Sequence, residues 1–251
     1  STRKESSAAS DVYKRQLFMY PVYGGFWGFD PTMVVLIPAI LLTIYAQFKV
    51  SSTTNKYLRV NTRRGYTGEQ TARRVLDSNG LYDVKIEMVR GHLSDHYDPR
   101  RKAVRLSEDV YYGTSITSVA VAAHECGHAI QHAKGYAPLQ IRSSLVPVVN
   151  FASSISWFLI FLGFIMAGPF LKIGILLFSA SVLFQIITLP VEFNASSRAI
   201  VQLGNLGIID ESESRQSRRV LSAAALTYVA AALVSILQLL RLLLIAQRRN
   251  D

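Results

Sequence analysis

Residues 145–171 read LVPVVNFASSISWFLIFLGFIMAGPFL, and none of these side chains is charged. Lys172 follows, and no further charge occurs before Glu192. A helix needs about 20 apolar residues to cross the hydrocarbon core of a bilayer. The block is therefore long enough for two membrane-spanning helices, and Gly168-Pro169 supplies a turn between them.

Two further apolar runs stand on either side of this block. Residues 31–48 carry no charge, and residues 221–246 carry only Arg241. Half of the 251 residues are hydrophobic, and a buried soluble core would not need so many long uninterrupted runs. The sequence predicts an integral membrane protein with spans at about 31–48, 147–167, 171–190 and 221–245.

The positive charge follows the membrane topology. The net charge is +10, and Lys49, Lys56 and Arg59 come directly after the first span, whereas residues 19–30 contain no Lys or Arg. The positive-inside rule therefore places the segment after the first span in the cytoplasm. Basic loops beside membrane spans explain the excess charge, and no nucleic-acid motif accompanies it, so we expect no nucleic-acid partner.

The segment between the first span and the uncharged block has the pattern of a small soluble domain. Thr67 and Gln70 form a capping box for a short helix that should stop at Asn79-Gly80. Alternating apolar residues and turn signals predict three strands, which we expect to form a small antiparallel sheet. These strands lie at 82–89, 92–97 and 103–106.

Two helices should follow the strands. Ser107 can cap a short helix through Tyr112, and Thr114 or Ser115 should begin a longer helix that ends near Ala133. The longer helix contains the run HECGH at 124–128, which is an H-E-x-x-H motif.

The motif predicts a zinc peptidase. Positions i and i+4 share one face of a helix, so His124 and His128 can both bind one metal ion. Glu125 lies beside them and can take the proton of a metal-bound water. A chance match on an ordinary amphipathic helix is the alternative. Cys126, the only cysteine, lies off the ligand face, can form no intrachain disulfide and is expected to pack between helices.

A catalytic zinc also needs a third protein ligand and one open position. Glu192 comes directly after the apolar core of the third span, where Pro190 should end or kink the helix. Two spans after a cytoplasmic insert return the chain to the cytoplasm. Glu192 is therefore expected on the same side of the membrane as His124 and His128.

Several separate segments, in order, resemble the YugP-like family of membrane zinc metallopeptidases, which is distantly similar to the HtpX-like membrane proteases. The resemblance covers about 19–247. The segments are NGLYDV at 79–84, DHYDP at 95–99, AAHECGHAIQH at 122–132, LPVEF at 189–193 and LSAAALTYVA at 221–230.

The resemblance implies His124 and His128 as zinc ligands, Glu125 as the catalytic base and Glu192 as the third ligand. It also implies hydrolysis of peptide bonds in a protein or peptide substrate. The family pattern after the glutamate is usually Phe-Asp-Ala-Ser, whereas Asn194 stands here in place of the aspartate. Asn194 could still accept a hydrogen bond from a ligand imidazole, or it could be an exposed residue with no role at the metal.

The sequence leaves several assignments open. His132 is expected at the solvent or at the rim of the substrate site. A catalytically silent membrane quality-control scaffold and an intramembrane protease of the site-2 type are the alternative functions. The latter class uses an aspartate from an L-D-G-like segment, and none occurs here. Substrate identity and oligomeric state are not encoded in any recognisable pattern. Five residues could stabilise the oxyanion: His96, Tyr111, Tyr112, Tyr136 and Arg198.

The expected fold is thus a mainly α membrane protein of about four transmembrane helices, with a cytoplasmic zincin-like metallopeptidase insert that contains a small antiparallel sheet. We expect it in a bacterial cell membrane, with the site facing the cytoplasm. The expected segments are a leader foreign to the fold (1–18), the first transmembrane segment (19–48), the catalytic insert (49–146), a transmembrane hairpin (147–190), a cytoplasmic segment with the third zinc ligand (191–220) and a C-terminal membrane helix with its tail (221–251).

Overall fold

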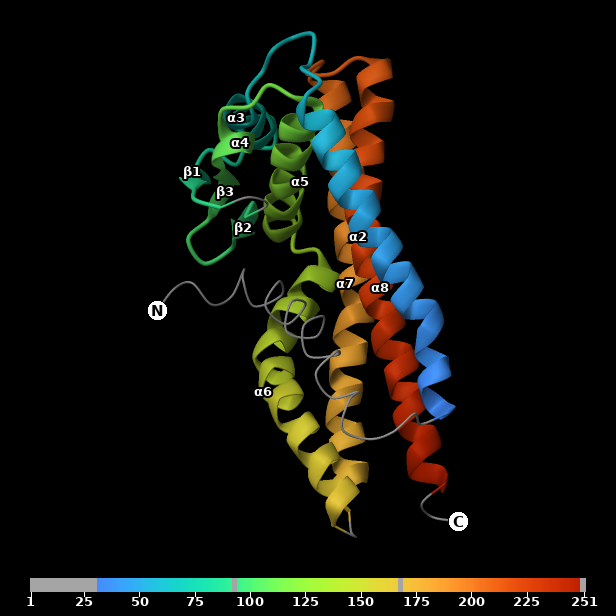
Figure 1. Cartoon of the computed structure of the whole chain (residues 1–251). Helices are drawn as coiled ribbons and strands as arrows, with labels where there is room; N and C mark the ends of the chain where they lie inside the picture. Colours follow the sequence, from blue (N-terminus) through green and yellow to red (C-terminus); the bar gives the residue numbers. More distant parts are fainter. Residues whose placement is uncertain (1–30, 92–93, 167–168, 249–251) are drawn as a thin grey trace. The chain divides into compact units, whose positions relative to one another are not determined.

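The computed structural model describes residues 31–91, 94–166 and 169–248, and it is mostly helical with one small sheet (Figure 1). The predicted leader 1–18, the first residues of the strand predicted at 92–97 and Gly168 of the predicted turn lie outside the described residues. The elements are η1 (Pro31–Leu36), α2 (Ile37–Leu58), α3 (Gly68–Ser78), β1 (Lys85–Val89), β2 (His96–Asp98), β3 (Ala103–Ser107), α4 (Glu108–Tyr111), α5 (Ile116–Ala133), α6 (Ala137–Ile165), α7 (Phe170–Asn205) and α8 (Glu211–Arg248).

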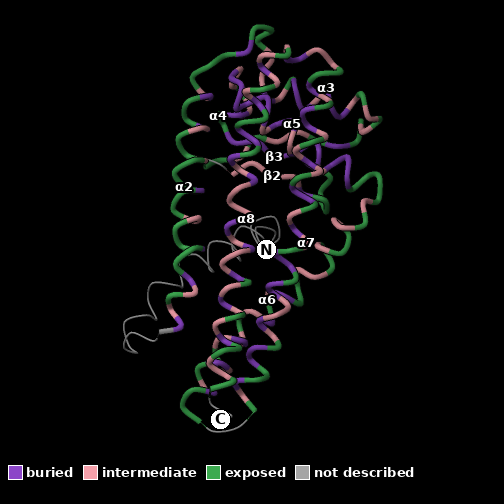
Figure 2. The backbone as a smooth tube through the Cα atoms, turned by 90° about the vertical axis from the view of Figure 1, so that its right-hand side faces the viewer, coloured by how far each residue is buried: buried purple, intermediate pink, exposed green. Residues whose placement is uncertain are grey.

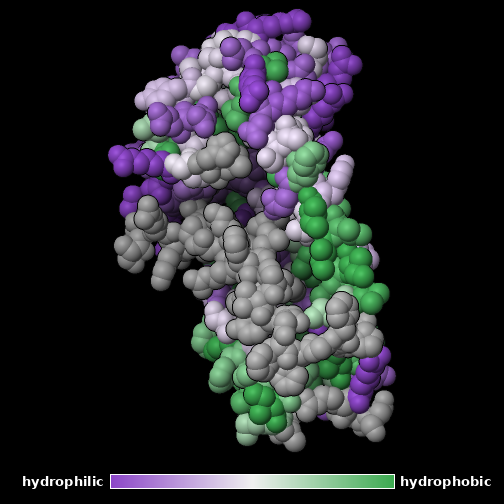
Figure 3. Space-filling view, viewed as in Figure 1, coloured by the Kyte–Doolittle hydropathy of each residue, from purple (hydrophilic) through white to green (hydrophobic). Residues whose placement is uncertain are grey.

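The described residues form two compact units. The first comprises 31–45, 141–188 and 228–248, and the second comprises 46–140 and 189–227. Among the described helices, four are long and apolar enough to cross a membrane, which confirms the predicted number: Thr32–Leu58, α6, α7 and α8. The visible surface of the first unit is largely apolar, and that of the second is largely hydrophilic (Figure 3).

The first of these helices is longer than its apolar run. The predicted span stops near Phe48, but α2 continues to Leu58. Its last turns are polar and mostly exposed, but Thr54 and Tyr57 are buried in the second unit. There, Tyr57 packs against Ile116 and Val220. Figure 2 shows the remainder of α2 as a mostly exposed helix.

Pro190 does not end the third apolar helix, because α7 runs through it to Asn205. Proline inside a helix removes one hydrogen bond and costs about 3 kcal/mol. The helix continues because Val191, Ala195 and Ala199, which share one face at i, i+4 and i+8, are all completely buried. The predicted cytoplasmic segment 191–220 is therefore the second half of α7, a short turn and the start of α8.

The sheet is mixed and not wholly antiparallel as predicted. β2 and β3 form the expected antiparallel hairpin, but β1 runs parallel to β3 on its other side, in the order β1-β3-β2. The reason is the length of the connections. A short turn at 99–102 can only reverse the chain, whereas the residues after β1 carry it past β3 to the far edge. β2 also begins later than predicted, at His96.

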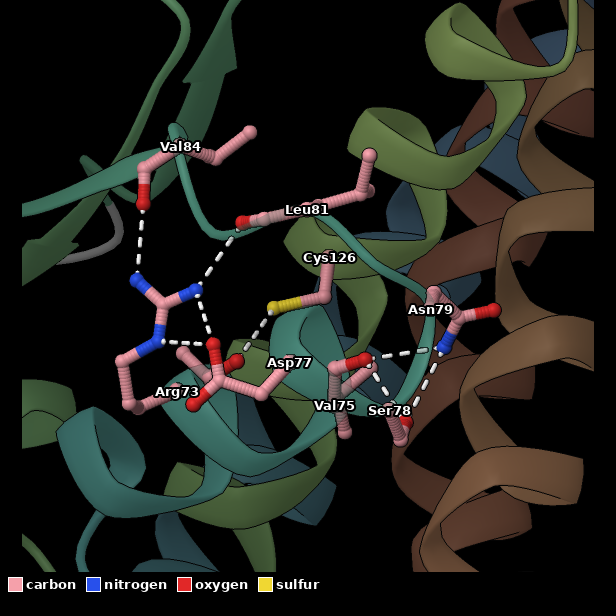
Figure 4. A network of polar contacts seen from close by, with 9 residues as sticks. Arg73, Val75, Asp77, Ser78, Asn79, Leu81, Val84 and Cys126 are labelled. Carbon is pink, nitrogen blue, oxygen red and sulfur yellow. Dashed lines mark hydrogen bonds and ion pairs between the residues drawn. The ribbon is translucent and has the colours of Figure 1, made fainter.

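The helices α3 and α5 cover the sheet with a continuous apolar core (Figure 2). The capping box of Thr67 and Gln70 is present at the start of α3, as predicted. Arg73, in the middle of α3, binds Asp77 and the carbonyl oxygens of Leu81 and Val84 (Figure 4). This arginine therefore fixes the loop that leads into β1.

Cys126 has the predicted packing role. It lies on the buried side of α5, where its thiol donates a hydrogen bond to the carbonyl oxygen of Ala72 on α3 at 3.6 Å (Figure 4). Burial raises the pKa of the thiol, so the group stays protonated and unreactive.

The two caps predicted before α4 and α5 differ. Ser115 caps α5, since its hydroxyl accepts a hydrogen bond from the N–H of Ser118. Ser107 precedes α4 but its side chain makes no cap; the hydroxyl and the N–H both donate to the carboxylate of Asp95. Asp95 thus draws the segment before β2 onto the end of β3.

Gly127 allows α5 to approach α7 very closely. A Cβ at position 127 would lie 2.6 Å from the carbonyl oxygen of Ala195, closer than real Cβ atoms come. Gly127 is the residue directly before His128, and Ala195 lies one turn after Glu192. The absence of a side chain therefore sets the distance between the two helices at the level of the three predicted zinc ligands.

We predict that Gly127→Ala separates the two helices and lowers the free energy of unfolding by about 1–3 kcal/mol, the usual cost of overpacking. Circular dichroism of the purified protein in detergent, with thermal or denaturant unfolding, would measure this. Gly204→Ala on α7 is the matched control, because a Cβ there meets nothing within 4 Å. It should leave stability unchanged or raise it by up to about 1 kcal/mol. Equal effects of both changes would contradict the role of the close contact.

Candidate metal centre

The two motif histidines lie on adjacent turns of α5, as their spacing predicts. Their ring centroids are 4.8 Å apart and their planes are almost perpendicular, at 87°. The side chains of His124 and His128 are 15% and 12% exposed, so both rings reach the edge of the core without leaving it. Two imidazoles in this arrangement can converge on one point.

Glu192 of α7 lies at that point. Its Oε2 is 3.4 Å from Nε2 of His124 and 3.6 Å from Nε2 of His128, and its side chain is only 4% exposed. Among the described residues, these three form a group of potential metal ligands whose atoms all lie within 4.8 Å of one another. The structure thus brings together the three residues that the sequence predicts as ligands.

Gln131 fixes the orientation of the His128 ring. Nδ1 of His128 is 3.0 Å from Oε1 of Gln131. The amide nitrogen of Gln131 donates to the carbonyl oxygen of Val191 at 2.8 Å. Because a carbonyl oxygen can only accept, the nitrogen of the amide must face Val191, and its oxygen must face His128. Nδ1 of His128 must therefore carry the proton. The lone pair of the ring is on Nε2, the nitrogen that faces Glu192.

His124 is held in a similar way. The hydroxyl of Ser196 contacts its Nδ1 at 3.1 Å, so Nε2 is again the nitrogen that faces Glu192. Ser196 lies four residues after Glu192 on the same face of α7. One helix therefore supplies both the carboxylate and a support for the opposing imidazole.

Asn194 supports a ligand imidazole only indirectly, and not by the direct hydrogen bond considered from the sequence. Its Oδ1 accepts from the amide of Gln131 at 3.0 Å and from Nε of Arg198 at 2.7 Å. It does not contact an imidazole directly; it supports His128 through Gln131. The two donors settle the orientation of its amide, because only an oxygen can accept both bonds. Arg198 is engaged in this network, which argues against its prediction as an oxyanion donor.

These geometries fit a zinc ion. In tetrahedral zinc sites, bonds of about 2.0–2.2 Å place two ligand atoms about 3.3 Å apart. The separations of 3.4 and 3.6 Å between the carboxylate oxygen and the two ring nitrogens are close to that value and longer than ordinary hydrogen bonds. The donor set of two neutral imidazoles and one carboxylate is one that zinc prefers.

Glu125 lies in an environment suited to a base. It is 8% exposed, and burial raises its pKa to about 7, with smaller increases from the nearby charges of Asp95 and Glu192. His124 and a hydrogen bond from the main-chain N–H of Tyr97 act in the opposite direction. A carboxyl group whose pKa is near neutrality can both accept and return a proton.

The structure places other residues that the sequence suggested as oxyanion donors, and His132, relative to the motif histidines. His96 pairs with Arg105 across the sheet, so its side chain lies on the face opposite Val104, which packs into the core with α5. Tyr112 lines a cavity of about 400 Å³ with Ser115 and Ser118, at the start of α5 and not at the motif. His132 is exposed, as predicted.

Sequence reasoning missed Gln131 and Ser196, the two residues that orient the imidazoles. Both could have been found by helical spacing, since Gln131 is three residues after His128 and Ser196 is four residues after Glu192. The spacing alone does not show that both residues make contacts between the two helices. Ser196 of α7 orients an imidazole of α5, and Gln131 of α5 donates a hydrogen bond to α7.

A buried centre of two histidines and one carboxylate, in a chain with four long apolar helices, is the arrangement of a membrane metalloenzyme. The chain belongs to the family described as "putative neutral zinc metallopeptidase", whose model matches residues 32–247. This confirms the resemblance seen in the sequence.

Over 217 residues the chain is 56% identical to the Bacillus subtilis (strain 168) protein described as "Putative membrane protease YugP". The alignment covers 86% of this chain and 96% of that protein. No solved structure gives a significant match.

We predict that Gln131→Leu lowers zinc affinity by about 10–100-fold, because the change removes the acceptor for His128 and the donor to Val191. Competition with a chromophoric chelator would measure the affinity of the purified protein. Asn194→Asp is the matched control: it keeps the acceptor for Gln131 and should leave zinc binding intact and activity equal or higher. A Gln131→Leu protein that binds zinc as tightly as the wild type would show that the amide does not orient the ligand.

Proposed function

We propose that the protein is an integral membrane zinc-dependent endopeptidase that hydrolyses peptide bonds of membrane or unfolded proteins, with its site facing the cytoplasm. The observation that carries this proposal is the convergence of His124, His128 and Glu192, with Nε2 of both imidazoles close to the same carboxylate oxygen. The family and the membrane protease relative support the same reaction.

In the proposed reaction the three ligands would hold Zn²⁺. The bound ion would supply a Lewis acid that acidifies water and polarises a carbonyl group. A carboxylate ligand makes the metal centre less cationic than three histidines would. Gln131 and Ser196 hold the rings so that no reorientation is needed before substrate binds.

Glu125 is the proposed general base. It takes a proton from the attacking water and passes it to the amine that leaves when the peptide bond breaks. Its burial beside Asp95 favours the neutral form enough for the proton to be taken up, while the N–H of Tyr97 stabilises the carboxylate once the proton has left.

Two alternatives fit less well. A silent scaffold has no use for a second buried carboxylate beside the ligands, and Glu125 is such a group. A site-2-type protease would carry its motif in a spanning helix. α5 is not among the described helices that are long and apolar enough to cross a membrane, and the sequence has no L-D-G-like segment.

We predict that Glu125→Gln retains zinc but reduces cleavage of a casein-like unfolded substrate by at least about 100-fold, since the amide cannot take the proton. Elemental analysis gives the metal content, and release of labelled peptides gives the rate. A silent scaffold would show no zinc-dependent cleavage in the wild type either, and that result would exclude the peptidase.

Glu192→Gln is expected to lose both zinc and activity, because it removes the anionic ligand. Glu213→Gln is the matched control. Glu213 is also buried in the second unit, but its carboxylate caps the start of α8 through the N–H groups of Arg63 and Asp210. That change should leave the zinc content unaltered.

A further inference from the structure

Three hydrogen bonds join Arg198 of α7 to the ring of His128 on α5. Nε of Arg198 donates to Oδ1 of Asn194 at 2.7 Å, and the amide of Gln131 donates to the same oxygen at 3.0 Å. Oε1 of Gln131 in turn lies 3.0 Å from Nδ1 of His128. Spacings of i,i+4 on α7 and i,i+3 on α5 make two of these contacts possible. Arg198 is therefore connected to a proposed zinc ligand through two amide side chains.

The two amides in the middle of this network could in principle be reversed. A half-turn of an amide exchanges its oxygen, which accepts, for its nitrogen, which donates. If Gln131 and Asn194 both turned, the hydrogen bond between them would persist in the opposite direction. The nitrogen of Gln131 would then face Nδ1 of His128, and the ring proton would move to Nε2, the nitrogen that faces Glu192. In that tautomer Nε2 of His128 has no lone pair for a metal ion.

The two ends of the network cannot be reversed. The carbonyl oxygen of Val191, which binds the amide of Gln131 at 2.8 Å, can only accept, and the guanidinium of Arg198 can only donate. Reversal would bring two oxygens together at Val191 and two N–H donors together at Arg198. Gln131 and Val191 are completely buried, so water cannot relieve the first of these contacts. Both ends therefore favour the direction that leaves Nε2 of His128 able to bind a metal.

We propose that Arg198 is a positioning residue of the metal centre. Through the two amides it holds His128 in the tautomer whose Nε2 can bind zinc. This inference rests on the zinc site of the proposed function, and it gives Arg198 a role other than the oxyanion donor suggested by the sequence. Asn194 depends on Arg198 because its neutral amide can present either an oxygen or a nitrogen. An aspartate at this position would present an oxygen in both orientations.

Arg198→Leu is expected to weaken zinc binding by about 10-fold, the lower end of the effect of residues that support a metal ligand. Removal of a positive charge near a cation site would by itself strengthen zinc binding, so a loss cannot come from the charge alone. Competition with a chromophoric chelator measures the affinity of the purified full-length protein. Arg198→Lys keeps the charge and a donor and should lose less. Arg218→Leu, which changes an exposed arginine of α8, is the matched control and should bind zinc as tightly as the wild type.

The same change in an Asn194→Asp background separates the orientation of the amides from the stability of the fold. With an acceptor oxygen on either side of residue 194, the direction of the network no longer depends on Arg198. Arg198→Leu should therefore reduce zinc affinity much less in this background than in the wild type. If Arg198 only stabilises the fold, the double variant should bind zinc no better than Arg198→Leu, because the carboxylate has lost its cationic neighbour. That result would overturn the positioning role.

The tautomer of His128 can also be measured without metal and without activity. In zinc-free protein with ¹⁵N-labelled histidine, NMR should show the ring proton of His128 on Nδ1 in the wild type and a second tautomer in Arg198→Leu. If Arg198→Leu has the wild-type affinity and a single tautomer, the positioning role is rejected and the peptidase stands. If the wild type binds zinc but cleaves nothing, the peptidase fails, and the affinities and tautomers still decide the role of Arg198. If the wild type binds no zinc, both fail.

Discussion

The site depends on one close contact between two helices. Gly127 of α5 lies against the main chain of Ala195 on α7, and the amide of Gln131 donates to the carbonyl oxygen of Val191. These contacts on either side of Glu192 hold its carboxylate opposite the two imidazoles. Three ligand atoms can converge only if the main chains approach this closely, because histidine and glutamate side chains have limited reach. The apolar strip of α7 that follows Pro190 supplies the burial that keeps the helices together.

The polar side chains that support the two imidazoles have a fixed orientation. Gln131 accepts from one ring and donates to the other helix, and Asn194 and Arg198 continue the network along α7. Buried polar networks are stable only when every member has a partner, and their orientation is then unique. Here that orientation leaves Nε2 of both imidazoles facing the carboxylate of Glu192. Contacts within the protein thus direct the three potential ligand atoms at one point.

The sheet contributes through its edge. The hairpin turn joins β2 to β3, and Asp95, the residue before β2, binds Ser107 at the end of β3. The hydroxyl of Tyr97 in β2 lies 2.9 Å from Nδ1 of His132 on α5. A single strand residue thereby connects the edge of the sheet to an exposed histidine of α5. The sheet thus packs on α5, and α7 completes the group of potential metal ligands.

The sequence by itself determined the four apolar helices, the capped helix with its two histidines, and the single glutamate beyond the third apolar run, because these follow from local periodicity and charge. It did not determine the parallel pairing of β1 with β3, the continuation of α7 through Pro190, or the positions of Gln131 and Ser196 beside the two imidazoles. Those depend on contacts between residues far apart in the chain, such as Gly127 with Ala195. Local sequence patterns predict which face of a helix or strand is buried, but only the tertiary structure determines which buried faces pack against each other.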